Sequence, residues 1–106
     1  GPMFGQCGHF LGYAPRKIPY AIDRYRNETL RLYGVMDKRL AKSEFLADDY
    51  SIADIATLGW VNALVELYAA GDILSLSDYS NIQKWLGRGL ARPAVQRGLQ
   101  IPARSA

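Results

Sequence analysis

Residues 48–56, DDYSIADIA, contain a complete helix-start signal directly before a long apolar run. Ser51 can accept a hydrogen bond from the backbone N–H of Asp54, and the Asp54 carboxylate can accept one from the Ser51 N–H. This is the capping-box arrangement, with Asp in place of the usual Glu. Tyr50 and Ile55 are spaced to close a hydrophobic staple over the same turn. The segment predicts that a helix begins just after Ser51, and on residue chemistry alone Ser51 and Asp54 have a structural role.

Apolar periodicity predicts helices along the rest of the chain and no strand. A long helix is expected from Pro19 to about Lys42, because side chains three and four residues apart mark one face: Ile22, Tyr25, Thr29, Leu32, Met36 and Leu40. The helix after Ser51 is apolar on nearly every side to about Ala70, with Gly71 to end it, so it is expected to be buried centrally. Shorter helices are expected near residues 78–92 and 93–99, and residues 3–12 read as the end of another helix running into a loop. The predicted fold class is an all-α helical bundle.

Composition narrows the range of functions. A chain of 106 residues is one domain by length, and its 49% hydrophobic content suits a globular core. The net charge of +3 is spread without a run of five basic residues, which does not favour a nucleic-acid partner. No stretch approaches the roughly 20 apolar residues that a membrane-spanning helix needs. Cys7 is the only cysteine, so no internal disulfide can form, and a reducing, cytoplasmic setting is the default expectation.

The residues that could carry chemistry are few. His9 is the only histidine, which leaves neither a two-histidine metal site nor a catalytic triad. Cys7 and His9 are two residues apart, a helical spacing that points them to different faces and argues against a Cys–His nucleophile pair. The glycines at 1, 5, 8 and 12 do not form a phosphate loop, because no strand precedes them and no Gly-Lys-Ser or Gly-Lys-Thr follows. Neither a catalytic residue nor a metal site is therefore expected in this chain, and Trp60 and Trp85 are expected to be packing residues.

Three blocks of sequence carry a resemblance that covers nearly the whole chain in colinear order. They are GPMFGQ at residues 1–6 with His9, Phe10, Ala14 and Pro15; IPYAIDRY at 18–25 followed by RLYGVMDKRL at 31–40; and YSIADIA at 50–56 followed by Trp60, Val61, Asn62 and, later, ARPAV at 91–95. These blocks resemble the nu class of bacterial glutathione transferases, whose members act as glutathione-dependent disulfide reductases. The amino-acid sequence of the capping box is similar to that at the start of the sixth helix in that family.

The resemblance implies that residues 1–106 are the helical C-terminal domain of such an enzyme. The thioredoxin-like N-terminal domain, which in the family holds most of the glutathione site, is missing from this chain. The chain alone is then not expected to be catalytically competent. The full-length protein is expected to be a cytoplasmic homodimer that uses glutathione as co-substrate on a small disulfide or electrophile. The alternative is a non-catalytic module for protein–protein interaction, since helical domains of this fold also serve as assembly parts.

The resemblance also assigns site residues. Arg24 stands where the family has an arginine that contacts a carboxylate of glutathione or its disulfide, and a guanidinium suits that role because it can donate two parallel bonds to one carboxylate. The competing interpretation is an exposed arginine paired with Glu28. Gln6 and His9 fall on the segment that lines the cleft between domains, so they are predicted second-substrate contacts. The sequence departs from the family pattern at Gly59, where proline is common, and at Gly87 and Gly89, which weaken a helix.

Overall fold

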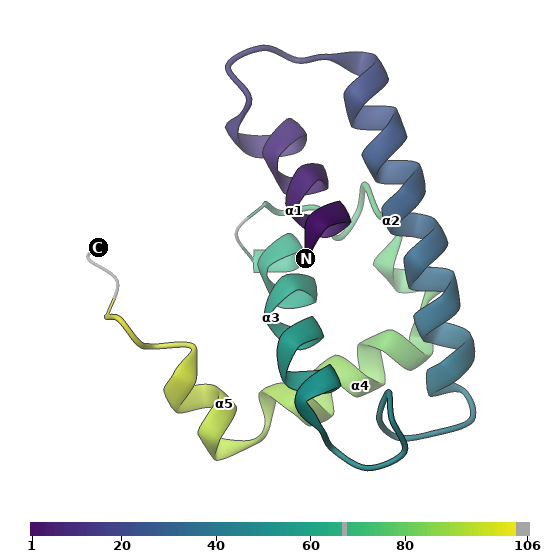
Figure 1. Cartoon of the computed structure of the whole chain (residues 1–106), viewed down its shortest axis with the longest axis vertical. Helices are drawn as coiled ribbons and strands as arrows, with labels where there is room; N and C mark the ends of the chain where they lie inside the picture. The colour runs from purple at the N-terminus through teal and green to yellow at the C-terminus, as the bar shows by residue number, and fades with distance from the viewer. Residues whose placement is uncertain (67, 104–106) are drawn as a thin grey trace.

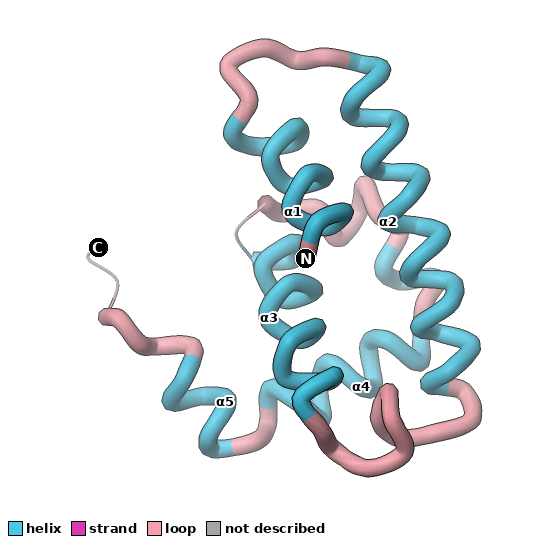
Figure 2. Tube along the Cα trace, viewed as in Figure 1, coloured by secondary structure: helices cyan, strands magenta, loops and turns pink. Residues whose placement is uncertain are grey.

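The computed structural model describes residues 1–66 and 68–103, which form five α-helices joined by loops (Figures 1 and 2). Their bounds are α1 (Pro2–Gly8), α2 (Pro19–Leu40), α3 (Ile52–Glu66), α4 (Ser80–Leu90) and α5 (Pro93–Gly98). A π-helical turn at His9–Tyr13 extends α1, and a 3-10 turn at Leu76–Asp78 precedes α4. Apart from two isolated bridges in the loop before α3, the described residues contain no β-structure. The predicted all-α fold class is confirmed.

The helices enclose one core between α2 and α3. α1 packs against both of these helices towards one end, and α4 packs against both at the other (Figure 1). α5 contacts α4 and projects beside α3, away from α2. The largest fully buried side chains come from all four enclosing helices and the loop before α4: Cys7, Thr29, Tyr33, Asp54, Val61, Leu64, Leu74, Ile82 and Trp85. Two of these nine residues, Thr29 and Asp54, are polar, so the environment of each matters for stability.

The N-terminal glycines allow α1 and its π-helical turn to approach two aromatic rings closely. A Cβ atom added to Gly8 would lie 2.6 Å from the Tyr68 ring, and one on Gly5 would lie 3.1 Å from Trp60. Gly12 and Gly1 continue the same contacts with Tyr68 and Trp60, respectively. Because the first of these distances is shorter than real carbon contacts, a side chain at Gly8 would force a shift. These four N-terminal glycines, which form no phosphate loop, thus have a packing role.

The end of α3 differs from the sequence prediction. The helix was expected to run to about Ala70 and to stop at Gly71, but it ends at Glu66. Ala69 has a left-handed backbone with φ of 48°, and the Ala70 N–H donates to the Leu64 carbonyl at 2.8 Å. The chain therefore turns back over the helix end, which buries Ala70. Leu67, which belongs to the predicted helix, lies outside the described residues.

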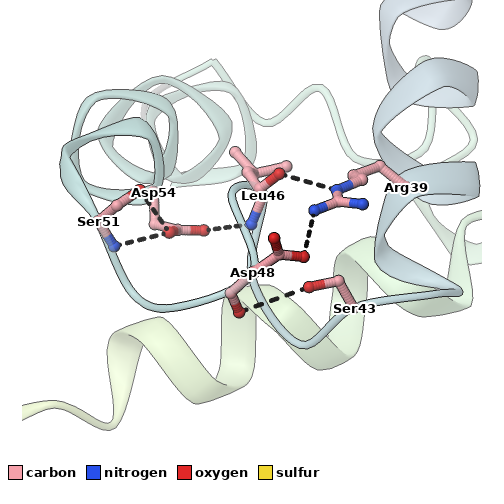
Figure 3. A network of polar contacts seen from close by, with 6 residues as sticks. All are labelled: Arg39, Ser43, Leu46, Asp48, Ser51 and Asp54. Carbon is pink, nitrogen blue, oxygen red and sulfur yellow. Dashed lines mark hydrogen bonds and ion pairs between the residues drawn. The ribbon is translucent and has the colours of Figure 1, made fainter.

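The predicted capping box is present at the start of α3, with one change in its bonding (Figure 3). The Ser51 N–H donates to Asp54 Oδ2 at 3.0 Å, as expected. The Ser51 hydroxyl oxygen, however, accepts from the Ala53 N–H at 3.2 Å, because the Asp54 N–H is already directed at the Ser51 carbonyl at 3.1 Å. Tyr50 and Ile55, the expected staple pair, both line an apolar hollow of about 260 Å³ against α5. The start of α3 was therefore placed correctly from sequence.

Asp54 also ties α3 to two distant segments. Its Oδ1 accepts hydrogen bonds from the Leu46 N–H at 3.0 Å and from the Trp85 indole N–H at 2.8 Å. The residue is only 1% exposed. Burial would raise the pKa of the Asp54 carboxyl, but the bonds from Leu46, Trp85 and Ser51 outweigh burial and lower it below its usual value. Asp54 is thus an ionised residue whose three backbone and indole N–H donors come from the loop before α3, from the helix cap and from α4.

Arginines hold the loop between α2 and α3 in place. Arg39 donates to the Leu46 carbonyl at 2.9 Å and to Asp48 Oδ1 at 2.7 Å, as Figure 3 shows. From the other side, the Arg92 guanidinium lies 3.6 Å from the centre of the Tyr50 ring, a cation–π contact. These contacts position the backbone of the loop that supplies Leu46 to Asp54.

A carboxylate from another helix caps α4. Asp37, in the last turn of α2, accepts hydrogen bonds at Oδ1 from the backbone N–H groups of Asn81 and Ile82, at 3.0 and 3.1 Å. These are the N–H groups that an N-cap side chain usually satisfies, and Tyr79, at the cap position itself, has no side-chain cap bond. The beginning of α4 therefore depends on its packing against α2.

Candidate functional site

Arg24 lies on the outer face of α2, beside an open hollow of about 450 Å³. The hollow is lined by side chains from three turns of the one helix: Tyr20, Asp23, Arg24, Asn27, Glu28 and Arg31. We call this surface the Arg24 groove. Arg24 is exposed, and within the described residues its guanidinium makes neither a hydrogen bond nor an ion pair; its one contact is a distant approach to the Tyr25 ring, 5.9 Å from the ring centre. All the donors of its fork are thus free to bind a ligand.

Glu28 pairs with Arg31 and not with Arg24. The Arg31 fork donates from Nε to Glu28 Oε2 at 2.9 Å and from Nη2 to Oε1 at 2.6 Å, the two-bond geometry that arginine and carboxylate favour. The hydrogen bond from Arg31 lowers the pKa of Glu28, and the charge of Arg24 contributes a smaller effect in the same direction. The Arg24–Glu28 pair that the spacing allowed is therefore wrong. Glu28 has its own partner, and Arg24 is left with no carboxylate.

A row of aromatic contacts leads from His9 to Tyr25, the neighbour of Arg24 on α2. His9 meets the edge of Phe10 with ring centres 4.9 Å apart, and Phe10 stacks almost parallel on Tyr25 at 5.5 Å. Phe10 comes from the π-helical turn after α1, whereas Tyr25 and Arg24 are neighbours on α2. The π-helical turn is closed by the bond from the Ala14 N–H to the His9 carbonyl at 2.8 Å. The structure thus connects two of the predicted site residues, His9 and Arg24, through Phe10 and Tyr25, whose role the sequence reasoning missed.

The predicted second-substrate residues are placed on α1 and its π-helical extension. His9 is exposed, and so is Gln6, one turn earlier. Neither residue lines the Arg24 groove. Their predicted contact with a second substrate stays a prediction, and only His9 is connected to Arg24 through neighbouring side chains.

Cys7 is unsuited to act as a nucleophile. It is 1% exposed, and burial raises the pKa of its thiol, although the Thr29 hydroxyl and the charge of Arg26 partly oppose this effect. His9, two residues later, is exposed, so the two side chains occupy different environments as their spacing indicated. In the part of the chain that the structure describes, three or more potential metal ligands nowhere lie together, and no helix has the length and apolar character to span a bilayer.

α3 exposes an apolar stripe, which corrects the expectation that this helix is buried on every side. The stripe, called here the α3 stripe, consists of Ile52, Ile55, Ala56, Gly59 and Trp60. Ile52 is 83% exposed, Ile55 56% and Trp60 37%. The opposite side of α3 is buried by α1 and α4, and these two helices together cannot surround it. A helix that is apolar on every side needs packing partners on every side. The apolar residues around the whole of α3 were therefore the sequence signal from which the exposed stripe could have been predicted.

Comparison with known proteins identifies the family. The model of the glutathione S-transferase C-terminal domain matches residues 19–88. The disulfide-bond oxidoreductase YghU of Escherichia coli strain K12 is 44% identical over 97 residues, which cover 89% of this chain and 34% of that protein. The disulfide-bond oxidoreductase YfcG of the same strain is 46% identical over 100 residues, covering 93% of this chain and 44% of that protein. The chain thus spans less than half the length of these curated relatives.

Solved structures agree with the sequence comparison. A glutathione transferase of Burkholderia graminis, with two glutathione molecules bound per subunit, superposes with a TM-score of 0.92 at 45% identity, covering 99% of this chain and 45% of that one. A glutathione transferase of Pseudomonas putida, with one glutathione disulfide bound per subunit, gives 0.92 at 46% identity, covering 97% and 46%. The chain belongs to the glutathione S-transferase family, as a C-terminal helical domain.

Proposed function

We propose that this chain is the helical part of a glutathione-dependent disulfide reductase or thiol transferase. The observation that carries the proposal is the identity of 44–46% with two bacterial disulfide-bond oxidoreductases over about nine-tenths of the chain. The co-substrate of the longer protein is glutathione, and its second substrate is a small disulfide or electrophile. Cys7 is buried and therefore unsuited to act as a nucleophile, and we assign the chemistry to a thioredoxin-like domain outside these residues.

Within that function, Arg24 binds a carboxylate of glutathione or of its disulfide. Three features support this role: the guanidinium is exposed, Glu28 is held by Arg31, and an open hollow lies beside it. Glutathione carries two carboxylates, and an arginine fork grips one through two charge-assisted bonds. Asp23 and Glu28 line the same groove, so a bound carboxylate must sit on the side of Arg24 and away from these acids.

The α3 stripe supports the two-domain interpretation. Its three large side chains, Ile52, Ile55 and Trp60, are apolar and lie on one face of the helix over about two turns, a pattern typical of a surface that another folded unit covers. We place the thioredoxin-like domain against this face. The stripe equally suits a non-catalytic interaction module, which is the alternative function, because any apolar partner could cover it. We also propose that the longer protein is a homodimer and that it is cytoplasmic, the setting in which the lone, buried thiol of this chain would stay reduced.

An activity assay on the longer native protein separates the two functions. We expect glutathione-dependent reduction of a small-molecule disulfide by that protein and none by the 106-residue chain. The chain alone should also fail to bind glutathione tightly in titration calorimetry. A longer protein that binds a partner yet reduces no disulfide with glutathione would favour the interaction module. Micromolar affinity of the isolated chain for glutathione would overturn the assignment of most of the glutathione site to the thioredoxin-like domain.

A further inference from the structure

A second hollow, independent of the Arg24 groove, lies at the other end of α2. It has a volume of about 300 Å³ and is bounded by the end of α2, by residues 42–44 and by one face of α4. Its lining residues are Leu40, Ala41, Lys42, Ser43, Glu44, Asn81, Lys84 and Arg88. Leu40 lies 16 positions after Arg24 in α2, a distance of roughly 24 Å along the helix. The two sites therefore share no lining residue.

Cations gather in this hollow without acidic partners. Lys42, Lys84 and Arg88 line it against a single carboxylate, Glu44, and within the described residues none of the three cations forms an ion pair. Lys84 and Arg88 are four residues apart on α4, a spacing at which like charges repel. The negative end of the α2 dipole accounts for Lys42, since a cation near the last turn of a helix is stabilising. It does not account for Lys84 and Arg88, which lie on another helix.

The hydrogen-bond donors at the hollow are incompletely used. Arg88 is fixed by a bond from its Nη2 to the Glu44 carbonyl and by the Phe45 ring, yet its Nε is buried and no described atom accepts from it. The Ser43 hydroxyl makes only a long contact, 3.5 Å from the Asp48 carbonyl. By contrast, Asn81 donates hydrogen bonds from its backbone N–H and its side-chain amide to the Asp37 carboxylate, so neither of these residues is available to a ligand. A buried arginine N–H without an acceptor is costly. Because Nε is closed to solvent, an anion in the hollow would accept from the Nη1 group, which makes no described hydrogen bond.

We propose that this hollow binds a phosphate group. The guanidinium of Arg88 and the ammonium of Lys84 form its main contacts, Ser43 donates a hydroxyl, and Lys42 adds charge. Arginine and lysine are the usual side chains for phosphate, the first through a planar fork and the second as a point charge. The volume admits a free phosphate ion or the phosphate end of a small metabolite and is too small for a folded partner.

The test is an NMR titration of the 106-residue chain with inorganic phosphate, at constant ionic strength maintained with sodium chloride. We expect saturable shifts confined to the amides of residues 42–44 and 81–88. Lys84→Gln should weaken binding about fivefold, or about 1 kcal/mol, as expected for one exposed charge. Lys38→Gln, an exposed lysine of α2 outside the hollow, is the matched control and should bind as the parent does. If Lys84→Gln folds poorly, Lys42→Gln replaces it.

Two results would overturn the proposal. One is a set of shifts that grow linearly and equally with phosphate and chloride; the other is an unchanged phosphate affinity in the lysine variants of the hollow. A parallel titration with methyl phosphate distinguishes the possible sources of the group. Binding of both ligands indicates a phosphorylated metabolite, whereas binding of inorganic phosphate alone indicates the free ion. Because the test does not involve glutathione, it can fail without affecting the proposed function.

Discussion

Asp54 and Arg24 are both charged, and their surroundings are opposite. Asp54 is 1% exposed and accepts hydrogen bonds from Leu46, Ser51 and Trp85, so both oxygens of its carboxylate have donors within the protein. Arg24 is exposed at a groove and has no described hydrogen-bond partner, although a carboxylate lies one turn away. The comparison distinguishes charges that stabilise the fold from charges that are available for binding. A matched, buried charge fixes the fold, whereas an unmatched charge on a rigid helix is available to a ligand.

The largest expected effect is on the buried side of this comparison. Asp54→Ala should lower the free energy of unfolding by about 3 kcal/mol or more, because it leaves the Leu46 N–H, the Ser51 N–H and the Trp85 indole without an acceptor. Urea denaturation measures the change. Asp49→Ala, which removes an exposed carboxylate from the same loop, is the control and should change stability by less than about 0.5 kcal/mol. Equal stability of the two variants would show that the Asp54 network contributes nothing.

Two glycines of α4 should respond in opposite directions. A Cβ on Gly89 would lie 2.6 Å from Leu58 Cδ1 in the buried contact between α3 and α4, so Gly89→Ala should destabilise the protein by about 1–3 kcal/mol. Nothing lies within 4 Å of a Cβ on Gly87, and Gly87→Ala should stabilise α4 by up to about 1 kcal/mol. Thermal unfolding of the two variants checks this. A stabilised Gly89→Ala would mean that Leu58 moves freely and that the core beneath Asp54 is looser than the structure indicates.

Acid should weaken the Asp54 network. The folded-state pKa of Asp54 lies below its ordinary value of 3.8, so its contribution to stability is complete above about pH 3.8 and is lost as the pH falls through the folded pKa. Asp54→Asn removes this titration. The difference in unfolding free energy between the parent and Asp54→Asn should therefore shrink as the pH falls from about 5 to about 2. Denaturation curves recorded across that range test it, and a constant difference would contradict the lowered pKa.

The sequence predicted the local features and not the contacts that join distant segments. The Ser51–Asp54 bond spans three residues and could be predicted from spacing. The bonds from Trp85 to Asp54 and from Asn81 to Asp37 span 31 and 44 residues, and they exist only because α4 crosses α2 and α3. No local pattern contains that crossing.

The candidate site was likewise predictable from sequence only in part. Arg24 was chosen by resemblance to the family, but its spacing could not show whether Glu28 pairs with Arg24 or with Arg31, since both lie one turn away. Only the side-chain geometry decides for Arg31. The α3 stripe was hidden for a related reason, because an apolar residue looks the same in sequence whether this chain covers it or leaves it for another unit.

The measurement that tests the central claim most directly is glutathione disulfide binding by the longer protein with Arg24 changed. Arg24→Lys keeps the charge and loses the two-bond geometry, so it should weaken binding about tenfold. Arg24→Ala should weaken it further, by about 1–3 kcal/mol in total. Both variants should unfold within about 0.5 kcal/mol of the parent, because Arg24 has no described hydrogen-bond partner to lose. Parental affinity in both variants would contradict the ligand role and return Arg24 to the solvated face of α2.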